Sequence, residues 1–122
     1  MASKDEDIQQ RIIREGNLRT IPLSPELAEV SGSVSASIML MQIMYWQSRG
    51  TIMPGWVKKS HAEWTEELGI NRKAQQRSRK LLKDRGLIEE RKLGSPPTLY
   101  YRAVKKEILK QLQQLRSRKG KA

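Results

Sequence analysis

Residues 71–85 constrain this chain most, because they carry the start and stop signals of a helix that is almost uniformly positive. Asn71 is a good N-cap, since its side-chain oxygen can accept an orphan backbone N–H of the first turn. Gly86 supplies the left-handed residue at which such a helix ends. Upstream, residues 60–63 have the spacing of a capping box and predict a shorter helix over residues 61–68. Two helices joined by a tight turn form the helix-turn-helix pattern.

The second helix has one inward face and one cationic face when its residues are spaced at about 100°. The inward face holds Ala74, Ser78, Leu81, Leu82 and the stem of Arg85. The opposite face and its flanks hold Arg72, Lys73, Gln76, Arg77, Arg79, Lys80 and Lys83. A solvated charged surface is the alternative, but such surfaces usually mix both signs, and here the sign stays positive until Asp84. We therefore favour binding to nucleic acid, because Arg, Lys and Gln read base edges and hold phosphates.

The net charge of the whole chain agrees with this interpretation. The 122 residues include 24 basic and 13 acidic side chains, a net charge of +11, which suits one domain with a polyanionic partner. Nucleic acid is the favoured partner and an anionic membrane surface is the rival, although no apolar residues are interleaved on the basic helix face. There is no cysteine, which excludes disulfides and zinc–cysteine sites and fits a reducing cytoplasm.

The first half of the chain predicts an arm and two helices. Residues 1–17 are polar and mixed in charge and could form a frayed helix or a disordered arm; we expect a disordered or partly ordered arm. Ser24 and Pro25 open a short helix that should end near Gly32. Residues 35–49 are apolar almost all round, which predicts a central buried helix too short to span a membrane. Its methionines either fill a small core or form an adaptable partner surface.

The second half predicts a β-hairpin and a last helix. Residues 56–59 are a short strand candidate, and residues 87–93 and 99–103 should pair around a turn rich in glycine and proline. Residues 104–116 form a last helix, and residues 117–122 form a basic tail that we expect to be disordered and able to lie along phosphates. The expected fold is mainly α with a small β-hairpin, in the α+β class.

This order of elements resembles the winged helix-turn-helix DNA-binding domain, here over residues 18–103 with an additional C-terminal helix. Within that class the chain is most similar to the DNA-binding domains of plasmid and phage replication initiators and replisome organisers. The residues that carry the resemblance are Gln42-Ile43-Met44-Tyr45-Trp46, Gly55-Trp56-Val57-Lys58, Glu63-Trp64, Leu82-Lys83-Asp84-Arg85-Gly86-Leu87-Ile88 and Tyr100-Tyr101-Arg102. Gln75 and Arg79 depart from the pattern, because many members carry an apolar residue there.

The resemblance implies a cytoplasmic, DNA-associated protein, bacterial or phage-encoded, that acts in replication initiation or transcriptional regulation. No segment for ATP hydrolysis is visible, so in replication the chain would serve as a DNA anchor, with replication or partition proteins as further partners. The runner-up interpretation is a protein-binding winged-helix adaptor that uses the methionine-rich helix or the C-terminal helix.

The predicted DNA contacts follow the docking of a recognition helix in the major groove of duplex DNA. Near-base contacts are expected from Arg72, Lys73, Gln75, Gln76 and Arg79, in the half of the helix that enters the groove, and Asn71 at the helix start is also expected to contact DNA. Phosphate contacts are expected from Arg77, Lys80 and Lys83, and from Lys58 and Lys59. The wing would bring Arg91, Lys92 and Arg102 to the backbone or minor groove.

Enzymatic patterns are weak in this sequence, and we expect neither catalysis nor a cofactor. His61-Ala62-Glu63 has the His-x-Glu spacing of zinc deaminases but no cysteine ligands accompany it, so a capping-box position with a solvent-facing imidazole is favoured. Trp56 and Trp64 could stack on unpaired bases, but burial is favoured. We expect the core to include Trp46, Trp64, Leu82 and Ile88.

The last helix leaves two alternatives open. Its apolar stripe consists of Val104, Ile108, Leu112 and Leu115. The stripe either packs on the methionine-rich helix or pairs with a second copy, because helix-turn-helix proteins commonly bind two-fold sites as dimers.

Overall fold

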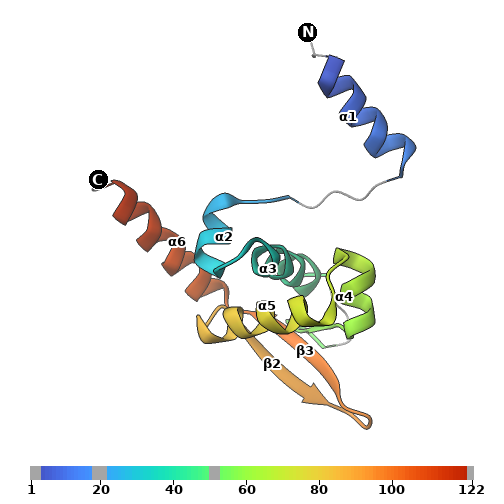
Figure 1. Cartoon of the computed structure of the whole chain (residues 1–122). Helices are drawn as coiled ribbons and strands as arrows, with labels where there is room; N and C mark the ends of the chain where they lie inside the picture. Colours follow the sequence, from blue (N-terminus) through green and yellow to red (C-terminus); the bar gives the residue numbers. More distant parts are fainter. Residues whose placement is uncertain (1–3, 18–21, 50–52, 121–122) are drawn as a thin grey trace.

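The computed structural model describes residues 4–17, 22–49 and 53–120 (Figure 1). This part of the chain is mainly helical and carries a small three-stranded antiparallel sheet. The helices are α1 Lys4–Glu15, α2 Pro25–Ser31, α3 Val34–Gln47, α4 His61–Leu68, α5 Arg72–Asp84 and α6 Lys105–Gly120. The strands are β1 Val57–Lys58, β2 Ile88–Leu93 and β3 Thr98–Ala103.

The apolar helix α3 lies at the centre of the fold, as the sequence predicts. It contacts α2, α5, β1 and β3, and its Met39, Leu40 and Ile43 are fully buried. One predicted core residue is wrong: Trp46, near the end of α3, remains 38% exposed. Its indole Nε1 donates a hydrogen bond of 2.7 Å to Glu67 Oε1, so the ring lies at the surface where that N–H finds an acceptor.

Local caps explain where the helices begin and end. Ser24 Oγ accepts from the backbone N–H of Leu27 at the start of α2. The capping box of Ser60 and Glu63 is formed at the start of α4. Gly86 has a φ of 73°, and the backbone N–H groups of residues 86 and 87 return to the last carbonyls of α5. These predicted helix boundaries are confirmed.

The sheet has the order β1-β3-β2 and packs one face against the helices. Tyr101 of β3 lies opposite both Val57 and Glu90, and the three side chains share the inner face. Tyr101 is fully buried and meets Trp64 of α4 edge to face, with ring centroids 5.7 Å apart. Trp64, Leu82 and Ile88 are buried, as predicted.

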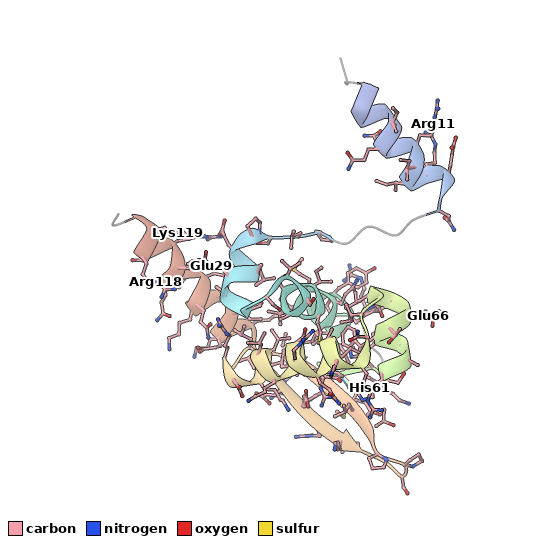
Figure 2. The ribbon with its side chains drawn as sticks, viewed as in Figure 1. Arg11, Glu29, His61, Glu66, Arg118 and Lys119 are labelled. Atoms are coloured by element: carbon pink, nitrogen blue, oxygen red, sulfur yellow. The ribbon has the colours of Figure 1, made fainter. Side chains whose placement is uncertain are left out.

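The two terminal helices differ from the sequence prediction. α6 continues to Gly120, so most of the stretch predicted as a disordered tail is helical. It packs on α2, where Arg116 pairs with Glu26 at 3.2 Å and Lys119 with Glu29 at 3.5 Å (Figure 2). Residues 4–15, predicted as a disordered or partly ordered arm, form α1, which stands apart from the other helices (Figure 1). Within the described ranges, only the bent pair α2 and α3, and no single helix, has the length and apolar character of a membrane span.

Candidate functional site

The exposed face of α5 carries a row of basic and amide side chains. Its exposed basic and amide residues are Arg72, Lys73, Gln76, Arg77, Lys80 and Lys83. Asp84 at the end of the helix is also exposed and pairs with Lys80 at 2.9 Å. Gln75, Ser78 and Leu82 face inward and hold the helix against α3 and α4. Asn71 caps the helix, because its Oδ1 accepts the backbone N–H of Ala74 at 2.8 Å. The inward face therefore differs by about one residue from the one predicted from apolar spacing.

Gln75 is fully buried and cannot reach a base, which corrects its predicted role in DNA contact. Its amide Nε2 lies within 3.1 Å of three acceptors, the carbonyl oxygens of His61 and Ile70 and the hydroxyl of Thr65. Its Oε1 lies 3.0 Å from Nδ1 of His61. The imidazole of His61 was predicted to face solvent, and this contact corrects that prediction. The side chain of Gln75 fixes α5 against its neighbours, because His61 and Thr65 belong to α4 and Ile70 belongs to the turn between the two helices.

Arg79 is also removed from the predicted base contacts. Its guanidinium forms a bidentate pair with Glu90 of β2, with Nε–Oε1 at 2.7 Å and Nη2–Oε2 at 2.8 Å. The two side chains are only 15% and 10% exposed. Lys83 reaches the same carboxylate at 3.4 Å while remaining half exposed. A guanidinium engaged in this way joins α5 to the sheet rather than projecting outward.

The electrostatics of this cluster stabilise its charged state. The hydrogen bonds that Arg79 donates to Glu90 raise the pKa of Arg79. Burial acts to raise the pKa of Glu90, but the hydrogen bonds and charges of Arg79 and Lys83 lower it below its ordinary value of 4.5. Burial also raises the pKa of Tyr101, which lies beside Arg79. The carboxylate of Glu90 is therefore held ionised by its two cationic neighbours.

A cleft of about 480 Å³ separates the N-terminal ends of α4 and α5 from the end of the β2–β3 hairpin. Arg72 and Gln76 contribute from α5, and Lys92 contributes from β2. His61 lines the cleft from α4 and lies on the side of that helix that faces α5 (Figure 2). The cleft thus brings basic side chains from separate elements to one concave surface.

The hairpin arginines are positioned by an aromatic ring. Arg102 lies opposite Trp56 across the sheet, with its Cζ 4.7 Å from the ring centroid. The Cζ of Arg91 lies 4.9 Å from the same centroid. Arg102 also pairs with Glu89 at 2.6 Å. Trp56 is buried under these guanidiniums, so it is not available to stack on unpaired bases.

The two lysines before α4 have different environments. Lys58 is exposed on the outer side of β1, where a phosphate contact remains open to it. Lys59 is buried, pairs with Glu67 and lies 5.1 Å from the ring centroid of Trp46. Its charge is neutralised within the protein, which corrects the prediction of a phosphate contact.

Two of the four residues predicted for dimerisation are likewise unavailable, because Ile108 and Leu115 belong to the hydrophobic core.

Sequence reasoning missed the partners that organise this surface. His61, Glu67 and Glu90 each engage a polar or charged residue that was assigned to DNA or solvent. For Glu90 a signal existed, because strand alternation places it on the same face as Tyr101.

Comparison of the chain with protein-family models, curated proteins and solved structures finds no match. The interpretation of the site therefore rests on its geometry.

Proposed function

We propose that residues 18–103 are a winged helix-turn-helix domain that binds duplex DNA, with α4 and α5 as the helix-turn-helix and the β2–β3 hairpin as the wing. The observation that carries the proposal is that the exposed cationic face of α5 borders the same cleft as Lys92 of the hairpin. A helix and a hairpin that present cations to one side can hold one duplex between them.

The buried residues revise how the proposed interface divides its contacts. Arg72, Lys73 and Gln76 are exposed near the start of α5, where a recognition helix meets base edges. Arg77, Lys80 and Lys83 lie further along and suit phosphates. Lys58 and the hairpin residues Arg91, Lys92 and Arg102 extend the basic surface. By resemblance to replication initiators of plasmids and phages, the proposed role is replication initiation or transcriptional regulation.

The proposal is tested by the salt dependence of binding to a labelled duplex of random sequence, measured by fluorescence anisotropy. Wild type should bind with a steep loss of affinity as salt rises, because phosphate contacts release counterions. Arg77→Ala should flatten the slope of log affinity against log salt by about 0.9, the change for one phosphate contact.

Lys110→Ala is the matched control, because it removes one positive charge from the exposed surface of α6. It should leave the slope close to that of wild type. Equal slopes for Arg77→Ala and Lys110→Ala, or no measurable binding of wild type, would contradict the proposal.

A further inference from the structure

A groove of about 390 Å³ runs between α2, α3 and α6, on a surface formed by elements other than α4, α5 and the hairpin. Six of its lining side chains are apolar: Leu27, Met41, Met44, Ile108, Leu109 and Leu112. Ser24 and Lys105 stand at its edge. Leu109 is 59% exposed, so the groove presents apolar surface to solvent.

Helix α1 carries an apolar stripe of its own. Ile8 and Ile12, one helical turn apart, are 53% and 56% exposed. A helix of only twelve residues is marginal in water unless an amphipathic face is covered. Figure 1 shows α1 apart from the other helices of the chain. The helix therefore has an exposed apolar face that suits a groove, and it lies apart from the other helices of its own chain.

Charge complementarity identifies the body of this protein as the surface that suits α1. Residues 1–17 contain four acidic and three basic residues, although the chain as a whole carries a net charge of +11. Three of the acids, Asp5-Glu6-Asp7, are consecutive near the start of α1. Lys105 at the start of α6 lines the groove, and Lys106 follows it in the same turn. An amphipathic helix that begins with Asp5-Glu6-Asp7 and an apolar groove lined by Lys105 complement each other in both charge and hydrophobicity.

We propose that α1 of one copy docks in the α2–α3–α6 groove of a second copy, and that the exchange is reciprocal. A two-fold dimer then contains the same helix–groove contact twice, as closed symmetry requires. This inference goes beyond DNA binding and does not depend on it. It also differs from pairing along the stripe of α6, because Ile108 and Leu115 stay within their own core.

The test compares the mass of the full chain and its variants by light scattering across a dilution series. Wild type should have twice the mass of one chain and dissociate on dilution. Ile12→Asp on α1 and Leu109→Asp in the groove should each be monomeric at concentrations where wild type is dimeric. Both positions are exposed, so each variant should still melt cooperatively; Ile8→Asp provides a second variant of α1.

The controls are Gln10→Asp, on the opposite side of α1 from the isoleucines, and Gln114→Asp, on the side of α6 turned away from the groove. Both introduce the same charge and should remain dimeric. Mixing the Ile12→Asp and Leu109→Asp chains should restore a weaker dimer, because one intact helix still meets one intact groove. A monomeric wild type would overturn the proposal. That result is expected if α1 docks on its own chain or if the groove binds another protein. A dimer that survives either substitution would do the same.

Discussion

Gln75 and Gln76 are neighbours in sequence with opposite environments. Gln75 is buried with all its polar atoms engaged, whereas Gln76 is exposed and lines the cleft. A buried acceptor that loses its donor costs roughly 1–3 kcal/mol, because its desolvation is no longer compensated. The pair therefore separates the stability of the fold from the proposed contact with DNA.

We expect Gln75→Ala to lower the free energy of unfolding by about 2–3 kcal/mol, since several polar groups lose their partner together. Gln76→Ala should stay within about 0.5 kcal/mol of wild type, as exposed substitutions usually do. Urea denaturation followed by circular dichroism measures both values. On a duplex selected from random sequences, Gln76→Ala should reduce the preference over random DNA by about 1–3 kcal/mol. Equal stabilities of the two variants would contradict the assignment.

Glu90 makes stability depend on pH in a defined direction. Its pKa is lower in the folded protein than its ordinary value of 4.5, so the native state favours the ionised form. The resulting stabilisation is fully present above that ordinary value and is lost as the pH falls through the pKa of the folded state. Acid therefore weakens the link between α5 and β2.

We expect Glu90→Gln to lower the free energy of unfolding at neutral pH by about 1.5–3 kcal/mol, the range for hydrogen bonds to charged groups. The difference from wild type should shrink below about pH 4.5, where wild type loses the same charge. Denaturation at a series of pH values measures this. Glu89→Gln is the control, because its pair with Arg102 is exposed. A difference for Glu90→Gln that stays constant with pH would refute the argument.

At the scale of elements, Arg91 and Arg102 of the hairpin both lie over the ring of Trp56. We expect Trp56→Leu to weaken duplex binding, because the guanidiniums lose the surface that orients them. A double-mutant cycle with Arg91→Ala should give a coupling of about 0.5–1 kcal/mol, the worth of an exposed cation–π contact. The same cycle with Lys92→Ala should give none, since Lys92 lies at the cleft rather than over the ring. Equal coupling in both cycles would show that Trp56 acts only through general destabilisation.

The helix ends could be predicted from the sequence because their causes are local. Ser60, Glu63 and Asn71 each bond a backbone group three residues away, so the motif contains its own explanation. The strand pairing followed in the same way from alternation around one turn. The three-stranded sheet and the mainly helical architecture are therefore in agreement with the expected α+β class.

The rotation of α5 could not be predicted, because it depends on polar contacts between distant segments. Gln75 and Arg79 count as outward residues in any hydrophobic pattern. They face inward because His61 and Glu90, fourteen and eleven positions away, supply matching hydrogen-bonding groups. Trp46 shows the reverse case, since the acceptor Glu67 holds an aromatic residue at the surface. The spacing of apolar residues contains no information about such polar partners in distant segments.

At the scale of the whole molecule, α6 belongs to the same cooperative unit as the helices and sheet. Ile108 and Leu115 are in the core, and ion pairs join the helix to α2. We expect Ile108→Ala to lower the free energy of unfolding by about 2–5 kcal/mol. Leu109→Ala, at the adjacent exposed position, should change it by no more than about 0.5 kcal/mol when both proteins are compared at concentrations where the chain is monomeric. Thermal melts that leave Ile108→Ala as stable as Leu109→Ala would show that α6 is an appendage.

The burial of Gln75 has a consequence for which positions of this protein can vary in evolution. Because the buried side chains of α5, the Asn71 cap and the pairs with Glu90 hold the helix in place, the fold does not depend on the exposed positions 72, 73, 76 and 77. Substitutions there can accumulate without unfolding the scaffold, so the same fold can present many different exposed surfaces on α5. A library randomised at these four positions would draw its diversity from the part of the helix that the fold does not need.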